Sequence, residues 1–391
     1  MNFFHILHKN RTLSISLILF LTTLSVYLLS YRGEGKNYNY FVLLADAFLH
    51  GRLYLTVNPP WLNELVEIKN HFYIVSPPMP AILLMPFVFL FGPSFPQPIL
   101  SILIGSMNVV LSFIVILKYF RSEKLALWMS ILFGFGTIHW YHAEVGSSWY
   151  IAHIIAVFFI WLALLEIKTK QRLFLIGLLI SFAFLSRVPT IFAAVFPLIF
   201  LYEKLRNLKS ITLYALGLVV GILINSSYNF LSFGSFLNAG YFLIPNILNE
   251  PWYRYGLVNL RYISIHLNEL FTAMPKFKQD FPFVIPSLLA MSIFFTTPAF
   301  LFSFLAKFKK RLELASLLTL IAIALPNLMH GGNGFTQFGY RHTLDFMPFI
   351  LFLTASGIGN LKWWKKTLII LSILINLWGV LMISFFKLWT L

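Results

Sequence analysis

The stretch TLSISLILFLTTLSVYLLSY, residues 12–31, decides the fold. It carries no charge and has the length of roughly 20 residues that a helix needs to cross the hydrocarbon of a bilayer. Ten further apolar stretches follow, at 98–117, 125–140, 149–165, 173–186, 188–202, 211–231, 285–306, 312–329, 343–359 and 367–386. The sequence therefore predicts an all-α polytopic membrane protein with about eleven transmembrane helices.

The composition of the whole chain supports a membrane protein. Hydrophobic residues make up 59% of the 391 residues and charged residues 11%, and the mean hydropathy is +0.81. Soluble domains carry about 25% charged residues. The chain has no cysteine, so disulfides and thiol chemistry are excluded. We expect residues 1–391 to form a single integral membrane domain.

Cations gather in alternate connections between the apolar stretches. Eighteen of the 29 Lys and Arg residues lie there: Lys9, Arg11, Lys118, Arg121, Lys124, Lys168, Lys170, Arg172, Lys204, Arg206, Lys209, Lys307, Lys309, Lys310, Arg311, Lys362, Lys365 and Lys366. Only four acids accompany them: Glu123, Glu166, Glu203 and Glu313. By the positive-inside rule this side is cytoplasmic. The net charge of +16 therefore reflects topology, and no nucleic-acid partner is expected.

Residues 77–92, PPMPAILLMPFVFLFG, are apolar but short and contain four prolines. If this stretch spanned the membrane, every later connection would change sides and the basic connections would face outward. We therefore expect an interfacial or re-entrant helix, which is tolerated where protein or water satisfies its backbone. This topology places the N-terminus in the cytoplasm and the C-terminus outside it.

Two long connections fall on the extracytoplasmic side, at 32–97 and 232–284. Catalytic groups are often carried by loops on a rigid scaffold. In the first connection, YNYFVLLADAFLH at 38–50 has apolar residues at helical spacing. This pattern predicts a helix lying on the membrane that ends at Gly51. The candidate catalytic acids here are Asp46, Glu34 and Glu64, each of which is alternatively a solvated surface or turn residue.

Arginines on the extracytoplasmic side are candidates for binding an anion. Arg187 lies between two short apolar stretches, where a charge marks a functional residue or snorkels to the headgroups. Arg341 and His342 end the glycine-rich stretch HGGNGFTQFGYRH, residues 330–342. A helix N-terminus predicted there favours an anion, although Arg341 is alternatively an interfacial anchor. The second long connection contributes Arg254 and Arg261.

Two sets of histidines have spacings that suggest a metal. His139, His142 and Glu144 form a His-x-x-His-x-Glu pattern at the end of a span, and His330 and His342 bound the glycine-rich stretch. Polar residues at a helix end are the simpler explanation of the first set. The second set has no carboxylate at ligand spacing. The sequence thus indicates no metal site, divalent cation or other cofactor.

Several motifs, taken in order, resemble one family. They are LADAFLHGRLYL at 44–55, YIVSPPMPA at 73–81, LSRVP at 185–189, YNFLSFGS at 228–235 and GYR at 339–341. With the layout of spans and loops, they resemble the GT-C superfamily of integral-membrane glycosyltransferases. Within it, the chain is most similar to bacterial relatives of the protein O-mannosyltransferases. The resemblance extends from the first span to residue 349.

The resemblance implies a glycosyltransferase in the bacterial inner membrane. Such an enzyme transfers a sugar from a polyprenyl-phosphate-linked donor to an acceptor hydroxyl at the extracytoplasmic face. It implies membrane lipids as partners and a glycolipid, polysaccharide or protein as acceptor. It also implies that the base is one of Asp46, Glu34 and Glu64. The donor phosphate would then be held by external cations, namely Arg187, Arg341, His342, Arg254 and Arg261.

The chain departs from the family pattern shortly after the first span. Many relatives carry an adjacent Asp-Glu pair there, whereas residues 35–38 read GKNY. A catalytically inactive relative therefore remains an alternative. A transporter or flippase of lipid-linked glycan intermediates is another. Transporters often have inverted repeats with breaks at the midplane, whereas the Pro- and Gly-rich breaks here cluster on the extracytoplasmic side, which favours the enzyme.

Overall fold

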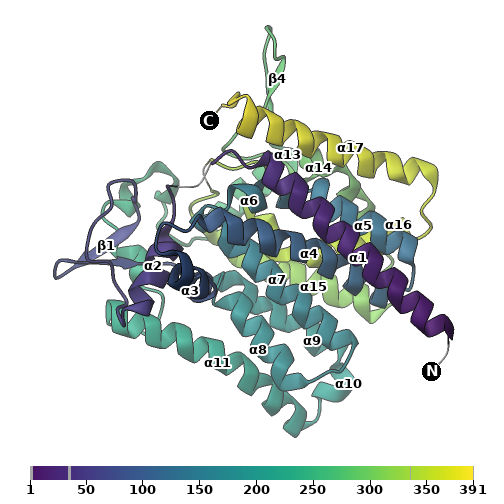
Figure 1. Cartoon of the computed structure of the whole chain (residues 1–391), viewed down its shortest axis with the longest axis horizontal. Helices are drawn as coiled ribbons and strands as arrows, with labels where there is room; N and C mark the ends of the chain where they lie inside the picture. The colour runs from purple at the N-terminus through teal and green to yellow at the C-terminus, as the bar shows by residue number, and fades with distance from the viewer. Residues whose placement is uncertain (1–2, 34–36, 335, 391) are drawn as a thin grey trace.

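The computed structural model describes residues 3–33, 37–334 and 336–390. They form a helical bundle with two small two-stranded hairpins (Figure 1). Six helices in this described part are long and apolar enough to cross a membrane: α1 (Phe3–Ser30), α4 (Gln97–Phe120), α7 (Ser148–Lys168), α11 (Leu208–Phe233), α15 (Arg311–Met329) and α17 (Trp363–Val380), which continues as a π-helical turn, η6 (Leu381–Phe385). The chain is an all-α polytopic membrane protein, as predicted.

The other predicted spans are shorter or broken helices. They are α5 (Glu123–Phe135), α8 (Leu173–Phe184), the 3-10 segment η1 (Val188–Ala194) with α9 (Val195–Phe200), and η5 (Arg341–Phe346) with α16 (Met347–Ile358). A helix of 12 or 13 residues is about 20 Å long, which is less than the roughly 30 Å of hydrocarbon. These elements depend on packing against the six long helices.

The stretch 285–306, predicted as one span, is helical only in α14 (Ile293–Thr296) and η4 (Pro298–Leu305). Its first part is extended and pairs with the C-terminal segment. The N–H of Leu288 donates to the carbonyl of Thr390 (2.8 Å), and the N–H of Thr390 donates to the carbonyl of Pro286 (3.0 Å). Because these backbone groups already have partners, this part does not continue the helix.

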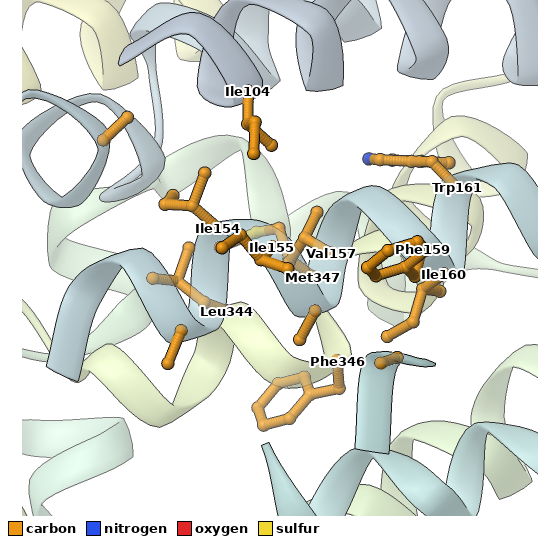
Figure 2. Packing of buried hydrophobic residues seen from close by; sticks show 14 of the residues in the cluster. Ile104, Ile154, Ile155, Val157, Phe159, Ile160, Trp161, Leu344, Phe346 and Met347 are labelled. Atoms are coloured by element: carbon orange, nitrogen blue, oxygen red, sulfur yellow. The ribbon is translucent and has the colours of Figure 1, made fainter. Parts of the chain in front are cut away.

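Helix α7 forms the centre of the bundle. Its membrane-length window is 83% buried, against 22% for α1 and for α11. Figure 2 shows Ile154, Val157 and Trp161 of α7 packed near Ile104 of α4 and Phe346 of η5. A helix that is apolar all round is buried within the protein, whereas α1 and α11 present apolar surface to lipid. Residues at the start of α7 therefore stand on the most enclosed element.

Helices α8 and α11 pack closely through glycines. A Cβ added at Gly217 would lie 2.1 Å from the carbonyl oxygen of Phe174, and one at Gly177 would lie 2.2 Å from that of Tyr214. Small residues let helix backbones approach one another in membranes. The approach holds α8, and the η1 segment after it, against the long helix α11.

The basic connections meet at one end of the bundle, which we name the basic end. Three contacts link them: Arg11–Glu123 (2.6 Å), Arg311–Glu203 (2.8 Å) and Lys204–Gln171 (3.1 Å). Helix α1 begins at this end, and the short helix α10 (Tyr202–Leu205) lies there too (Figure 1). The grouping of cations that the sequence predicts is present in the structure.

The two long connections lie at the opposite end, which we name the loop end (Figure 1). The first folds as α2 (Tyr40–Leu49), β1 (Leu65–Ile68), β2 (His71–Ile74) and α3 (Met79–Phe91). The second contains α12 (Gly240–Leu243), η2 (Ile247–Asn249), η3 (Pro251–Tyr253), α13 (Tyr262–Thr272), β3 (Lys276–Phe277) and β4 (Val284–Ile285). Both hairpins are antiparallel. The helix α6 (His139–Val145) enters α7 at this end.

The first long connection contains two short helices at the positions where the sequence predicts an interfacial helix and an interfacial or re-entrant helix. Helix α2 ends at Leu49 with His50 as its C-cap, and Gly51 follows in the left-handed conformation, with φ at +68°. Helix α3 covers most of residues 77–92 and has 13 residues, which is too few to cross the hydrocarbon. It packs against α2. Strands β1 and β2 contact the second connection through a small apolar cluster of Val66, Val75 and Ile244.

Candidate active site

Glu64 lies in the first long connection, directly before β1. Its Oε2 accepts a hydrogen bond from Nε1 of Trp149 at the start of α7 (3.0 Å), and its backbone N–H donates to the hydroxyl of Tyr40 (3.0 Å). Burial raises the pKa of the Glu64 carboxyl above its ordinary value of 4.5, although the Trp149 hydrogen bond and the charge of Arg341 lower it. A carboxylate with a raised pKa is a stronger base than an exposed one.

Arg341 begins η5 directly after the glycine-rich stretch. Its backbone N–H donates to Oε1 of Gln337 (3.0 Å). The side-chain Nε is shielded from solvent and has no hydrogen-bond partner among the described residues. The ion pairs of this region, Arg187–Asp345 and His266–Glu269, do not include it. Burial lowers the pKa of the guanidinium, so Arg341 is a partly desolvated cation that attracts an anion.

Gly334 gives the Arg341 side chain its space. A Cβ at this position would lie 2.6 Å from Oε1 of Gln337 and 2.9 Å from Nε of Arg341, and the φ of +102° is one that L-residues rarely adopt. The Tyr150 hydroxyl also donates to the carbonyl of Thr336 in this turn. The glycine-rich stretch is therefore a turn fixed around one arginine.

Arg187 precedes η1 and is held by a buried acid that the sequence did not single out. Its Nε donates to Oδ1 of Asp345 (3.4 Å) and its Nη2 to Oδ2 (3.2 Å). Nη2 also approaches Oδ1 of Asn327 (3.3 Å). The side chain of Asp345 is fully buried, whereas that of Arg187 is 21% exposed. Asp345 thus fixes the Nε–Nη2 edge of the guanidinium.

Two histidines complete the surroundings of Asp345. Nδ1 of His153, on α7, lies 2.6 Å from Oδ1 of Asp345. Nδ1 of His342 lies 3.1 Å from Nη2 of Arg187. Because arginine only donates, Nδ1 of His342 must accept, which leaves the proton of a neutral imidazole on Nε2. One sequence signal for this network was available, since an acid within a predicted span is a functional candidate by default.

Electrostatic effects connect Glu64 with Arg341 directly, and Glu64 and both arginines act on Tyr241. The pKa of Tyr241 is raised mainly by burial; the Glu64 charge raises it further, and Arg187 and Arg341 lower it. Burial lowers the pKa of His330 to about 4, and the same two arginines contribute to this decrease. These five residues from four segments of the chain therefore belong to one polar cluster at the loop end. We name Glu64, Arg187, Tyr241, His330 and Arg341 the loop-end cluster.

The remaining predicted site residues lie outside these interactions. Asp46, on α2, is within 3.7 Å of Nδ1 of His50, and both side chains are partly exposed. Arg254 and Arg261 are exposed, and each guanidinium lies over the ring of Tyr255, at 4.7 and 5.1 Å from its centroid. The third candidate acid, Glu34, lies outside the described residues.

The residues whose spacing suggested a metal site form hydrogen bonds with separate partners. Nδ1 of His139 lies 3.1 Å from the Tyr27 hydroxyl, and Nδ1 of His142 donates to the carbonyl of Ile138 (2.7 Å). Oε1 of Glu144 accepts from Ser384 (2.8 Å). Among the described residues, no group of three or more His, Asp or Glu side chains is placed to hold a metal ion.

Comparisons with known proteins agree with this architecture. No protein-family model matches the sequence, and no curated protein matches it either. Two solved structures are similar in fold, with TM-scores of 0.52 and 0.53 and sequence identities of 14% and 13%. They are the oligosaccharyltransferase of Archaeoglobus fulgidus in its apo form, and ArnT from Cupriavidus metallidurans bound to undecaprenyl phosphate.

The similarity covers nearly the whole chain. It extends over 95% of this protein and 55% of the oligosaccharyltransferase, and over 94% of this protein and 63% of ArnT. The chain thus spans less than two thirds of the length of either. Both are GT-C glycosyltransferases, as the sequence motifs led us to expect. The fold of this polytopic membrane protein is the GT-C fold.

Proposed function

We propose that this protein is a glycosyltransferase that takes a sugar from a polyprenyl-phosphate donor and transfers it to an acceptor hydroxyl at the loop end. The observation that carries the proposal is the pairing of a partly desolvated arginine, which has no ion-pair partner in the described part of the chain, with a partly buried carboxylate. Arg341 supplies the cation and Glu64 the carboxylate, and each affects the pKa of the other. The GT-C fold, with ArnT holding undecaprenyl phosphate, supports a lipid phosphate as the donor.

In this proposal, the arginines bind the donor through its phosphate. A guanidinium matches phosphate oxygens with a planar fork and stays charged at every physiological pH. Arg341 receives the phosphate because it forms no salt bridge with an acid among the described residues, and Arg187 is the second contact. Asp345 keeps the Arg187 edge in place. Positive charge that is already fixed stabilises the charge that develops on the departing phosphate.

Glu64 is the proposed base. As the acceptor oxygen bonds to the anomeric carbon, the bond from that carbon to the phosphate oxygen breaks. The polyprenyl phosphate leaves with the electron pair, and the hydroxyl proton passes to a carboxylate oxygen of Glu64. Proton removal by a positioned base requires a distance of about 2.6–3.2 Å from the hydroxyl. Glu64 has one oxygen held by Trp149, so the other oxygen is the one we assign to this step.

The membrane context of the proposal follows from the charge distribution. We infer that the basic end is cytoplasmic and that the loop end is extracytoplasmic, in the inner membrane of a bacterium. The acceptor is then a glycolipid, polysaccharide or protein outside the cytoplasm. The donor's prenyl chain reaches the loop-end cluster from within the bilayer.

The experiment uses purified protein in lipid nanodiscs with polyprenyl-phosphate sugars labelled in the sugar. Donors of mannose, glucose, galactose, arabinose and aminoarabinose are supplied with a membrane extract as acceptor. We expect the protein to transfer the labelled sugar from one of these donors to the acceptor. The Glu64→Gln variant should not transfer it. The matched control is Glu67→Gln, an exposed acid on β1, which should keep transfer.

Three results would overturn parts of the proposal. If no donor is consumed, the chain is not a transferase of this class. If proteoliposomes move the donor across the bilayer without transfer, the protein is a flippase. If Asp46→Asn abolishes transfer and Glu64→Gln does not, Glu64 is not the base.

A further inference from the structure

The second long connection carries a β-hairpin that stands away from the bundle. Strands β3 and β4 pair Lys276 with Ile285 and Phe277 with Val284, and the N–H of Lys278 donates to the carbonyl of Phe283 (2.8 Å). Figure 1 shows this hairpin protruding beyond α17, near the C-terminus. The hairpin comprises residues 274–285. All of them except Ile285 lie in the connection that the sequence predicts outside the membrane spans.

The hairpin exposes large aromatic side chains. Phe281 is 85% exposed, Phe277 66% and Phe283 60%, and Met274 at the base is 53% exposed. Phe281 and Phe283 contact each other edge to face, with centroids 6.3 Å apart. A loop in water rarely displays a contiguous patch of this kind, and such a patch usually marks a surface that another phase or partner covers.

The apolar surface of the hairpin is continuous with the lipid-facing side of the bundle. Val284, at its base, lines an apolar groove of about 190 Å³ together with Phe295 and three residues of α17: Leu374, Ile375 and Trp378. Helix α17 is one of the six membrane-length helices, and Leu374 is 55% exposed on its outer side. The C-terminal segment, which pairs with residues 286–288 just after the hairpin, also exposes Phe386, at 62%, and Trp389, at 42%.

The charges on the hairpin suit a phospholipid surface. Lys276 and Lys278 alternate with Phe277 and are exposed, and Asp280 is the one acid within 274–285. Lysine side chains near apolar surface place their stems among hydrocarbon and their ammonium groups in the headgroup region. Aromatic residues with neighbouring cations are typical of segments that lie in the membrane interface.

We propose that residues 274–285 form an interfacial anchor that inserts Phe277, Phe281 and Phe283 into the bilayer leaflet at the loop end. Lys276 and Lys278 then contact lipid phosphates. The anchor holds α13, and through it the second long connection, at a fixed height over the membrane. Continuity with α17 favours lipid over a protein partner, because a protein would have to displace lipid from the adjoining groove. The inference is independent of the proposed catalytic activity.

The absence of cysteine from the chain makes a clean test available. Phe281→Cys and, in a second variant, Phe283→Cys are labelled with an environment-sensitive fluorophore and reconstituted in nanodiscs of phosphatidylcholine and phosphatidylglycerol. The matched control is Glu250→Cys, an exposed polar site in the same connection. Quenching is measured with nitroxides on the lipid headgroup, with nitroxides on the acyl chain, and with iodide in water.

We expect the labels at 281 and 283 to show blue-shifted emission, quenching by the lipid nitroxides and protection from iodide. The label at 250 should show the reverse. Replacing phosphatidylglycerol by phosphatidylcholine, or combining Lys276→Gln with Lys278→Gln, should reduce the lipid quenching. Iodide quenching at 281 and 283 equal to that at 250 would overturn the proposal. Protection from iodide without lipid quenching would overturn it as well, since it would mean that a second copy or another protein covers the hairpin.

Discussion

At the scale of single residues, the surroundings of Glu64 have opposing effects on the pKa of its carboxyl group. Burial favours its protonated form, whereas Trp149 and Arg341 favour the carboxylate, and burial has the larger effect. Because the pKa of Glu64 is raised, its ionised form destabilises the fold relative to its protonated form. Such strain on a titratable group is common where the group takes part in chemistry.

Replacing Glu64 with Gln should therefore separate activity from stability. The pKa of Glu64 is raised in the folded protein, so its contribution to stability is greatest at low pH and declines as pH rises through the folded pKa. Gln removes that titration and can still accept from Trp149. We expect transfer to fall by roughly 10²–10⁴-fold, while the melting temperature at pH 7 rises. A variant that loses both activity and stability would assign Glu64 a structural role instead.

The pH dependence of transfer should follow the same group. A base works only when it is deprotonated, so activity should be present at neutral pH and lost as pH falls through the raised pKa of Glu64. The acid limb of the rate profile should therefore lie above pH 4.5, the ordinary value for glutamate. Initial rates measured between acidic and neutral pH in nanodiscs check this. A limb at or below the ordinary value would contradict the assignment.

Asp345 offers a prediction about stability. Asp345→Asn leaves the Arg187 cation without its buried partner, and removing one member of a buried pair costs about 3–5 kcal/mol. The double variant Asp345→Asn/Arg187→Gln should recover part of this loss, because it leaves no unpaired charge. Thermal unfolding of the two single variants and the double variant gives the coupling energy. Additive losses would show that the pair contributes no coupling.

The sequence identified some of these residues and missed others for a physical reason. Arg187, Arg341 and Glu64 stood out because charges are rare in so apolar a chain. Glu64 could not be chosen over Asp46 from the residues alone, since the choice depends on which acid lies near Trp149 and Arg341 of distant segments. Asp345 was overlooked inside a predicted span, although its isolation there was a signal.

At the scale of elements, the close approach of α8 and α11 should be sensitive to a single methyl group. Gly217→Ala places a Cβ 2.1 Å from the Phe174 carbonyl oxygen, so the helices must separate. Overpacking of this kind costs about 1–3 kcal/mol. The control is Leu223→Ala on the same helix, where the side chain is 60% exposed toward lipid. Thermal unfolding should show a loss for the first variant and little change for the second.

The long helices were predictable because their signal is local. Twenty apolar residues without a charge specify a span wherever they occur, and each of the six membrane-length helices overlaps a predicted span. The stretch 285–306 was less predictable. Its extended start is set by hydrogen bonds to Thr390, about a hundred residues further along the chain, and hydropathy carries no information about such pairing.

At the scale of the whole molecule, the separation of the two ends can be tested by labelling. Lys124→Cys and Lys309→Cys lie in basic connections, and Glu67→Cys lies in the first long connection. In intact bacterial cells, a membrane-impermeant maleimide should label Glu67→Cys. It should leave Lys124→Cys and Lys309→Cys unmodified until the membrane is permeabilised. Labelling of Lys124→Cys in intact cells would invert the proposed orientation.

The hydrogen bond from Trp149 to Glu64 links the pKa of Glu64 to the position of the first long connection. The acid sits on a surface segment, while the indole belongs to the most enclosed helix of the bundle. Lifting the segment would return the carboxyl to water, and its affinity for protons would fall toward that of an ordinary glutamate. If Glu64 is the base, as we propose, its raised affinity for protons depends on the contact between the first long connection and α7.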